Sequence, residues 1–294
     1  MPRVSILTPA YNCEKYIVET IESALKQTFQ DFEMIIVDDG SIDRTQEIVE
    51  RYVFNFPEKI RYIYQANGGP AKARNRGIRE SKGEYLALLD ADDLWLPNRL
   101  EETVAVLNRK AEVGLVHAKT KRILEDGRFT ETPRKNIRYL SGHIFPYILL
   151  RKANISCLTV LFRKECVEKV GYFDETKECF GVEDRDLWLR IASNYRIEFI
   201  DKVLGYYRLR SSGISQGEKI QANKIYVINK HCSSEQHKTL KKLALAQIYR
   251  ELGDSLLAQK EIVQAKYYYW QSISFYPFKF WPWINLLRLS LRRY

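Results

Sequence analysis

The sequence predicts an α/β fold, with a mostly parallel sheet flanked by helices and a helical extension at the C-terminus. Through residue 118, short apolar runs alternate with amphipathic helical segments, an order that is typical of parallel sheets covered on both faces. Beyond residue 217 the apolar spacing is helical throughout. Acidic residues directly follow two of the apolar runs, and open α/β sheets bind their ligands at the carboxyl ends of strands.

Strands and helices alternate regularly in the first part of the chain. The strands are expected at 3–8, 32–38, 61–65, 86–89 and 114–118. The helices between them carry apolar residues on one face and are expected at 17–25, 45–52, 71–81 and 100–107. Because the ends of strands one, two and four then meet at one edge of the sheet, the pattern brings together Tyr11, Asp39, Asp90 and Asp92.

After residue 118 the regular alternation ends. Two strands, 120–124 and 128–132, are expected around an Asp-Gly turn, and an irregular basic stretch follows at 133–154. The rest of the first domain is expected to contain a strand at 157–162, helices at 164–170 and from residue 184, and strands at 196–200 and 203–208. A loop rich in Ser and Gly at 210–217 is expected to be mobile, so the predicted domains are residues 1–217 and 218–294.

Composition places the chain among folded proteins, since 45% of its 294 residues are hydrophobic and 29% are charged. The net charge of +10 is uneven, because residues 218–294 contain 13 Lys and Arg against 5 Asp and Glu, a net of +8. A basic tail of this kind favours anionic surfaces such as membranes or nucleic acid. No recognised nucleic-acid-binding motif accompanies it, so nucleic acid is not expected as a partner.

Cysteine spacing and the N-terminus predict a cytoplasmic protein. The five cysteines are scattered without a C-x-x-C pair, which argues against a zinc site or a disulfide framework and fits a reducing cytosol. Met1 leads almost directly into the first strand, so no signal peptide is expected. No apolar run approaches the ~20 residues that span a bilayer. The expected location is the cytoplasm, with peripheral contact at the inner face of an anionic membrane.

The helical tail carries two further patterns. The spacing of Leu252, Gly253, Ala265 and Tyr269 resembles a single tetratricopeptide helix pair, in which small residues let two helices cross closely. From Phe278 to Tyr294, aromatic residues are interleaved with Lys and Arg, a mixture that suits a bilayer interface. The alternative for this last segment is a terminal helix that docks on the protein and keeps its cations in water.

The candidate site around which the chain is organised follows the strand at 86–89, where Asp90, Asp92 and Asp93 occupy three of four positions. Two carboxylates two positions apart can converge on one divalent cation, because Mg²⁺ and Mn²⁺ prefer oxygen ligands and substrate phosphates. Asp93 competes with Asp92 for this role, since spacing alone does not say which carboxylate turns inward. The structural alternative is a solvated acidic turn before the next helix.

Five motifs together resemble, in order and spacing, the family 2 glycosyltransferases of the Rossmann-like GT-A fold. They cover about residues 3–217 and are Thr8-Pro9-Ala10-Tyr11-Asn12, Val37-Asp38-Asp39-Gly40-Ser41, Ala73-Arg74-Asn75, Leu89-Asp90-Ala91-Asp92-Asp93 and Glu183-Asp184. The resemblance implies an inverting enzyme that uses a nucleotide-diphosphate sugar, most often UDP-linked, with Mn²⁺ or Mg²⁺. It also implies a glycan or lipid-linked acceptor, as in polysaccharide biosynthesis for the cell envelope.

The resemblance assigns the nucleobase to the edge of the sheet. Pro9 and Tyr11 lie where the family holds the base, and Tyr11 offers an aromatic face. Asp39 matches the carboxylate that accepts a hydrogen bond from uracil. Helix capping is the alternative role for Asp39, although Asp38 is the better candidate for that role.

The resemblance also places residues around the diphosphate. Asp90 is expected to touch the ribose or the metal, and Asp92 to ligate the metal that bridges the phosphates. Arg74 is a candidate for nucleotide or phosphate contact, and a solvated helix face is its alternative. Many relatives carry Tyr-Arg-x-His where this chain has Tyr207-Arg208-Leu209-Arg210. Because arginine clamps phosphate and does not ligate cations, Arg210 is expected to bind the diphosphate.

Asp184 is the candidate general base. An inverting transfer needs one base to deprotonate the acceptor hydroxyl, in line with a leaving diphosphate whose charge the metal offsets. Glu183 is able to exchange roles with Asp184, and an N-cap of the following helix is the structural alternative. No Ser-His-Asp or Cys-His pattern competes, and with four histidines in the chain a His-based metal site is not expected.

Two other functions agree with parts of the sequence. A nucleotidyltransferase would place a Gly-rich phosphate loop after the first strand, where this chain instead has Pro9-Ala10-Tyr11. A catalytically degenerate domain would act as a scaffold or binding module through its helical tail. The intact acidic motifs argue against this second alternative.

Overall fold

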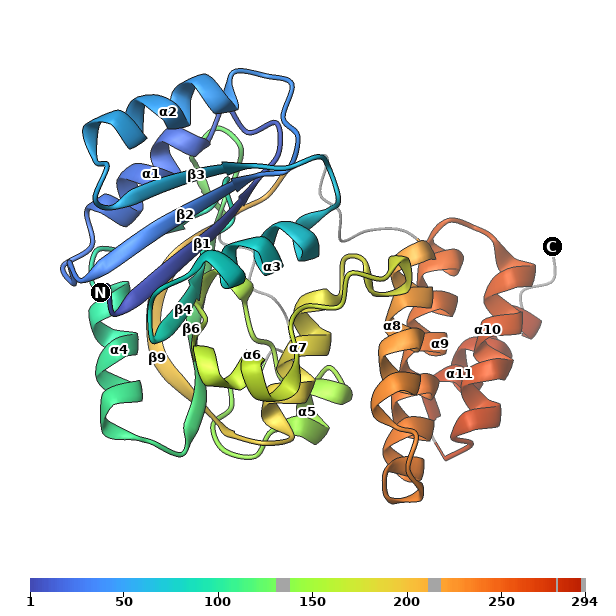
Figure 1. The fold of residues 1–294 in the computed structure, drawn as a ribbon. Coiled ribbons are helices and arrows are strands. Elements are labelled where there is room, and N and C mark those ends of the chain that lie inside the picture. The colour runs from blue at the N-terminus through green and yellow to red at the C-terminus, as the bar shows by residue number, and fades with distance from the viewer. Residues whose placement is uncertain (131–137, 211–217, 279, 292–294) are drawn as a thin grey trace. The chain divides into compact units, whose positions relative to one another are not determined.

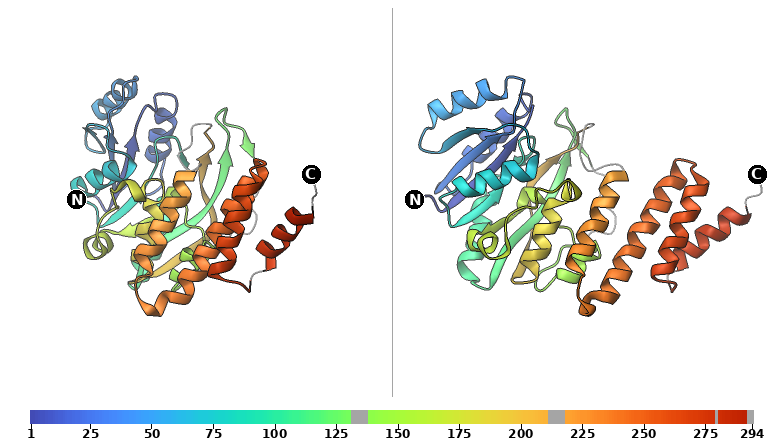
Figure 2. Two further views of the ribbon diagram at one scale, coloured as in Figure 1. Left: turned by 90° about the vertical axis from the view of Figure 1, so that its right-hand side faces the viewer. Right: turned by 45° about the vertical axis from the view of Figure 1, so that its right-hand side comes forward.

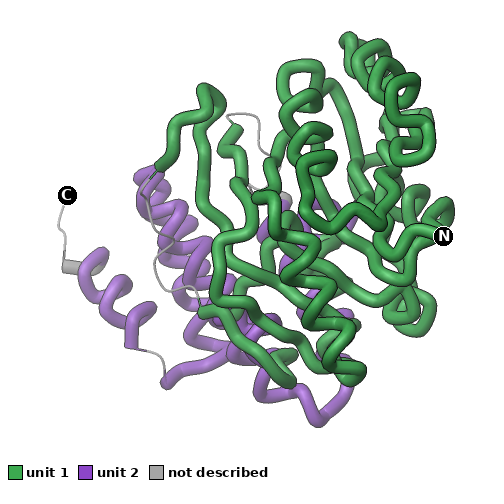
Figure 3. The backbone as a smooth tube through the Cα atoms, turned by 90° about the vertical axis from the view of Figure 1, so that its left-hand side faces the viewer, with its two compact units in different colours: residues 1–145, 153–175, 183–214 green, residues 146–152, 176–182, 215–294 purple. Residues whose placement is uncertain are grey.

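The computed structural model of the chain describes residues 1–130, 138–210, 218–278 and 280–291. They divide into two compact units, which Figure 3 shows in green and purple. The first unit comprises 1–145, 153–175 and 183–214, and the second comprises 146–152, 176–182 and 215–294. The domain boundary predicted after residue 217, and all but the first residue of the loop predicted at 210–217, lie outside the described residues.

The described strands of the first unit form one nine-stranded mixed sheet (Figure 1). Across the sheet the order is β3-β2-β1-β4-β8-β6-β9-β5, and β7 pairs with β6. The strands are β1 (Val4–Ala10), β2 (Phe32–Asp38), β3 (Ile60–Tyr64), β4 (Tyr85–Leu88), β5 (Leu94–Trp95), β6 (Val113–Ile123), β7 (Phe129–Thr130), β8 (Leu161–Arg163) and β9 (Arg196–Arg208).

The first half of the sheet is parallel, as the sequence predicts. β1 pairs with both β2 and β4, and β2 pairs with β3. In this register Ala10 lies opposite Asp38, and Leu7 lies opposite Leu88. The carboxyl ends of β1, β2 and β4 therefore meet at one edge of the sheet, and the acidic motifs follow them.

The second half of the sheet differs from the mostly parallel arrangement that the sequence predicts. β8 lies between β4 and β6 and runs antiparallel to both, whereas β6 and β9 are parallel. The strand expected at 157–162 is instead a 3₁₀ turn, Cys157–Thr159, followed by β8. The strands expected separately at 196–200 and 203–208 are one strand, β9, with register shifts against β6. The expected strand therefore overlaps β8 at Leu161 and Phe162 but begins too early, because the apolar run continues through the 3₁₀ turn and does not mark where the strand starts.

Helices cover both faces of the sheet (Figure 1, Figure 2). Those of the first unit are α1 (Ile17–Leu25), α2 (Thr45–Asn55), α3 (Pro70–Glu80), α4 (Arg99–Arg109), α6 (Lys164–Val170) and α7 (Glu183–Ala192). The short α5 (Phe145–Leu149) lies in the stretch expected to be irregular and belongs, except for Phe145, to the second unit. Buried residues of α1, α2 and α4 share a core with Ile6 and Ile36 of the sheet. α3 packs on the opposite face, where Gly77 lets the helix approach Leu7. This fixes where α3 presents Arg74.

The second unit is helical, and its main helices are α8 (Glu218–His231), α9 (Lys238–Ala258), α10 (Ile262–Phe275) and α11 (Phe280–Leu291). α9 and α10 cross closely, because a Cβ added at Gly253 would lie 2.6 Å from the ring of Tyr269. The Tyr269 hydroxyl donates to Asp254 Oδ1 at 2.9 Å, and the Ser272 hydroxyl donates to the Ala246 carbonyl at 2.6 Å. A small residue at 253 is therefore what allows the two helices to meet.

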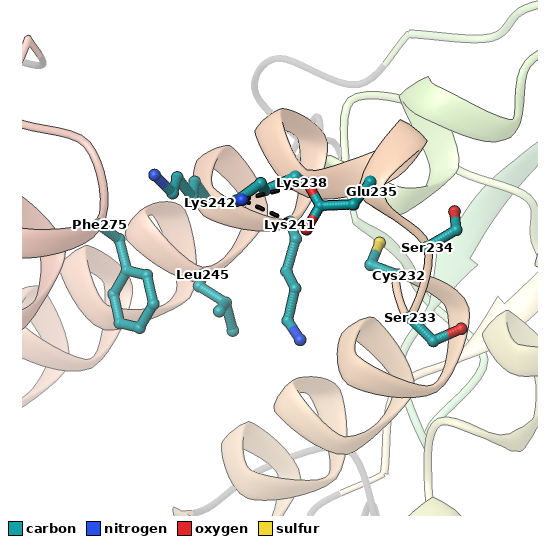
Figure 4. A pocket seen from close by; sticks show the side chains of 9 residues that line it. All are labelled: Cys232, Ser233, Ser234, Glu235, Lys238, Lys241, Lys242, Leu245 and Phe275. Atoms are coloured by element: carbon teal, nitrogen blue, oxygen red, sulfur yellow. Dashed lines mark hydrogen bonds and ion pairs between the residues drawn. The ribbon is translucent and has the colours of Figure 1, made fainter.

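A hollow of about 300 Å³ lies in the second unit, beside the turn between α8 and α9 (Figure 4). It is lined by Cys232, Ser233, Ser234, Glu235, Lys238, Lys241, Lys242, Leu245 and Phe275. The Lys238 ammonium donates to the Glu235 carboxylate at 3.1 Å, so these two charges are paired.

Among the described helices, none combines the length and the apolar character needed to span a bilayer.

We expect Gly253→Ala to lower the free energy of unfolding, measured by urea denaturation. Overpacking against the buried Tyr269 ring costs about 1–3 kcal/mol, which outweighs the gain of about 1 kcal/mol in helix propensity. Gln264→Ala, at an exposed position of α10, is the control and is expected to change stability by no more than about 0.5 kcal/mol. Equal stability of Gly253→Ala and wild type would contradict this packing.

Candidate active site

Asp39 directly follows β2, and the loop before α3 holds its carboxylate. The Gln65 side chain and the Gly68 backbone N–H donate to Oδ1 at 2.7 and 2.9 Å. The Gly69 backbone N–H donates to Oδ2 at 2.7 Å. A carboxylate offers about four lone-pair positions, so these three bonds leave one acceptor position on Oδ2 for a ligand.

The other residues expected near the base have distinct surroundings. Asp38 is fully buried and stabilises the turn after β2, since its Oδ1 accepts from the Ser41 backbone N–H and its Oδ2 from the Tyr62 hydroxyl, both at 2.8 Å. Pro9 lies within β1, opposite Val37 of β2. The side chain of Tyr11 follows β1 and is half exposed. Tyr11 is therefore accessible to a ligand, whereas both carboxylate oxygens of Asp38 accept hydrogen bonds from within the fold.

Arg74 joins two acidic motifs that are far apart in the sequence. Its Nη2 donates to Asp90 Oδ1 at 2.8 Å, and its Nη1 donates to Glu183 Oε1 at 2.9 Å. The side chains of Arg74 and Glu183 are each only 7% exposed, so the solvated helix face considered for Arg74 is wrong. The guanidinium also lies 5.6 Å from the ring centre of Phe173. Arg74 therefore fixes the loop after β4 against the start of α7.

Asp90 and Asp92 are partly exposed, and each faces an arginine. Asp92 Oδ2 lies 3.2 Å from Arg210 Nη1, and the Asp90 carboxylate contacts Arg74. Burial raises the pKa of Asp92, the nearby Asp90 charge raises it further, and Arg210 opposes both effects. Asp92 and the carboxylate that disfavours its charge form a donor set that a divalent cation would suit.

Asp93 is a structural residue rather than a second open carboxylate. It is 1% exposed, and its Oδ1 accepts from the Arg208 backbone N–H at 2.8 Å. Its backbone carbonyl accepts from the Thr20 hydroxyl at 2.9 Å. Burial raises the pKa of Asp93 well above its ordinary value. Of the two carboxylates that the sequence left in competition, Asp92 is the accessible one.

Glu183 and Asp184 begin α7, where unpaired backbone N–H groups and the helix dipole favour negative charge. Glu183 is buried and pairs with Arg74, whereas Asp184 is partly exposed. The Asp184 Oδ1 accepts a local hydrogen bond from the Arg185 backbone N–H at 2.6 Å. Burial raises the pKa of Asp184, and Arg185 and Arg74 oppose that shift. Asp184 is therefore the carboxylate of this pair that can reach a ligand.

Two contributors to this site carry no sequence motif. The ring centre of Tyr16 lies 4.9 Å from the guanidinium of Arg208, the last residue of β9, and 5.5 Å from that of Arg210, which follows β9. Burial raises the pKa of Cys157 well above its ordinary value, while Arg74 opposes the shift and Asp90 adds to it. The charges of Arg74 and Asp90 therefore act on this thiol. Neither residue belongs to a recognisable pattern, so only the fold reveals them.

We expect Arg74→Met to lower the free energy of unfolding by about 3–5 kcal/mol, because it leaves the buried Glu183 carboxylate without its cation. Replacing both partners, with Arg74→Met and Glu183→Gln together, is expected to recover part of that loss. Urea denaturation of both single variants and the double variant gives the coupling energy. Additive losses, with no recovery in the double variant, would contradict the buried pairing.

Residues 5–171 match the family model described as glycosyl transferase family 2. A relative from Rickettsia typhi, described as an uncharacterized glycosyltransferase, is 36% identical over 202 residues, which are 66% of this chain and 61% of that protein. Matches to the first curated relatives cover between 36% and 65% of their length. The chain therefore spans only part of those proteins.

Solved structures share the fold. Staphylococcus aureus TarS, residues 1–349, in complex with UDP-GlcNAc has a TM-score of 0.64 and 23% identity, over 94% of this chain and 89% of that one. The mannosyltransferase PcManGT from Pyrobaculum calidifontis, in complex with GDP-Man and Mn²⁺, has a TM-score of 0.58 and 19% identity, over 99% and 86%. These likenesses confirm the predicted α/β GT-A fold class with its C-terminal helices. The match to the family model covers more than half of the residues of this chain. The chain therefore belongs to glycosyl transferase family 2.

Proposed function

We propose that this chain is an inverting glycosyltransferase, which moves a sugar from a nucleotide-diphosphate donor to a hydroxyl of a glycan or glycolipid acceptor. The observation that carries the proposal is the Arg74 bridge between Asp90 and Glu183. Through this bridge, the acidic loop after β4 and the first turn of α7 both contact the Arg74 guanidinium. Two carboxylates of these motifs, Asp92 and Asp184, stay partly exposed beside it.

A UDP-sugar is the proposed donor. The open acceptor position on Asp39 Oδ2 suits the N–H of uracil, and the exposed ring of Tyr11 suits stacking on a base. The TarS complex with UDP-GlcNAc supports this choice through the shared fold. The PcManGT complex with GDP-Man makes guanosine donors the alternative that a binding test must separate.

The donor set of the acidic loop fits Mn²⁺ or Mg²⁺. Asp90 and Asp92 would hold the ion through carboxylate oxygens, the ligands that both metals prefer. When bound, the cation supplies positive charge that offsets the charge developing on the leaving diphosphate. Arg210 is proposed to serve the same phosphates, because its guanidinium is held over Tyr16 and already faces Asp92.

Asp184 is proposed as the general base. Its carboxylate takes the proton of the acceptor hydroxyl as the acceptor oxygen bonds to the anomeric carbon. The bond from that carbon to the diphosphate breaks in the same displacement, and its electron pair leaves with the diphosphate. Glu183 is unsuited to the role while its Oε1 accepts from Arg74. A pKa raised by burial makes the Asp184 carboxylate a stronger base than an exposed aspartate.

We expect UDP with Mn²⁺ to raise the thermal unfolding temperature of wild type and of Asp31→Asn, a control at an exposed carboxylate. At a ligand concentration of 100 Kd the stabilisation is about 2.7 kcal/mol. The shift should vanish in Asp92→Asn, because the donor set has lost a carboxylate. Stabilisation by GDP instead of UDP would change the proposed donor. No shift with any nucleotide would contradict the transferase proposal and favour a scaffold.

We expect Asp184→Asn to lose about 10²–10⁴-fold in turnover, the usual contribution of a general base, while it keeps the UDP-dependent thermal shift. In wild type, activity should fall as pH drops through the raised pKa of Asp184, because only the deprotonated carboxylate accepts the proton. The acid limb of the kcat/KM profile should therefore lie above the ordinary aspartate value of about 3.9. Full activity of Asp184→Asn would exclude this base.

A further inference from the structure

The second unit exposes a continuous apolar strip that its own fold does not cover. On α10 the strip contains Val263, Tyr267 and Trp270, and on α11 it contains Trp283, Ile284 and Leu287. These six side chains, here called the aromatic face, are between 37% and 77% exposed. Single exposed apolar residues are common on protein surfaces, whereas a contiguous group marks a binding surface.

Helix periodicity explains why the aromatic face faces outward. Residues 263, 267 and 270 follow the i, i+4, i+7 spacing of one helix face, and on α11 Leu287 follows Trp283 by four positions and Ile284 by three, which places these three on one face. The opposite faces of the two helices are already used, since Tyr269 of α10 and Leu286 of α11 share a buried core. The rings of Trp270 and Trp283 meet edge to face with centres 5.6 Å apart, which joins the two exposed stripes into one surface.

The charge around the aromatic face has one sign. The described helices α10 and α11 contain two charged residues, Lys266 and Arg288, and both are cationic. Arg288 is exposed on α11, one position after Leu287 and one helical turn after Ile284. The apolar side chains are therefore bordered by cations, which selects for an anionic partner.

We infer that the aromatic face binds the surface of an anionic lipid bilayer. Trp and Tyr favour the boundary between headgroups and acyl chains, and each Lys or Arg near an anionic surface adds to the attraction. A second copy of the chain fits less well, because a symmetric contact would bring the same face, and hence like charges, together. This inference goes beyond the proposed function, because it needs neither donor nor metal.

The proposed membrane-binding surface begins earlier in the chain than the interface that the sequence predicts. The sequence predicts a bilayer interface at Phe278–Tyr294, of which residues 279 and 292–294 lie outside the described part. The structure adds Tyr267 and Trp270 of α10 to the surface, and these residues belonged to no predicted interface. Tyr267 and Trp270 belong to a run of four aromatic residues, 267–270. The sequence does not show which of the four are buried and which are exposed, since this depends on how the helices pack.

The test is co-sedimentation of the full chain with vesicles of phosphatidylcholine alone, or of phosphatidylcholine mixed with an equal part of phosphatidylglycerol. We expect binding to the anionic vesicles only, and weaker binding as salt rises. Trp270→Ser with Leu287→Ser should weaken that binding about tenfold or more, and Arg288→Glu should also weaken it. The control is Phe54→Ser, which removes a side chain 85% exposed on α2 of the other unit and should bind as wild type does.

Circular dichroism and the thermal shift with UDP check that the variants keep their fold. Failure of wild type to bind anionic vesicles would overturn the inference. Binding that is the same in wild type and in Trp270→Ser with Leu287→Ser would also overturn it. Light scattering is the last check, since a dimer that dissociates in the Trp270 variant would assign the aromatic face to a second copy instead.

Discussion

The geometry of the candidate active site depends on one buried arginine side chain, Arg74. Arg74 donates from one guanidinium to the carboxylates of Asp90 and Glu183, which come from a loop after β4 and from the first turn of α7. The buried charges of Arg74 and Glu183 depend on each other, because an unpaired charge in a protein interior is strongly unfavourable. The next residue extends the anchor, since the Asn75 side chain accepts from the Phe173 backbone N–H and donates to its carbonyl, both at 2.9 Å. α3 thereby sets the geometry of both acidic motifs.

The elements around Arg74 are rigid for separate reasons. The edge where β1, β2 and β4 end is fixed by their parallel register and by apolar residues on both faces. α7 is fixed by the fully buried Asp186, which accepts from Arg190 at 2.8 Å, and by Arg190 itself, which donates to three carbonyls of the preceding segment. Carboxylates held on such elements need little reorganisation when a ligand arrives, which is the preorganisation that catalysis requires.

The sequence was most informative where local patterns decide the structure. The strand at 32–38 and the helix at 164–170 have the predicted limits, because each combines a clear apolar pattern with turn residues at its ends. The sequence could not show the partners of Arg74, since Glu183 lies 109 positions away and no helical pattern distinguishes a buried arginine from a solvated one. The three bonds to Asp39 were equally hidden, because two of them come from backbone N–H groups, which every sequence contains.

The account of the site predicts a single displacement at the anomeric carbon, with one base and no covalent intermediate. The most direct test is the configuration of the sugar that is first released, followed by proton NMR during hydrolysis of the sugar nucleotide that stabilises the protein best. Starting from an α-linked donor, the account predicts that the β-anomer appears first. First appearance of the α-anomer would contradict it, because a single in-line displacement inverts the configuration of the anomeric carbon.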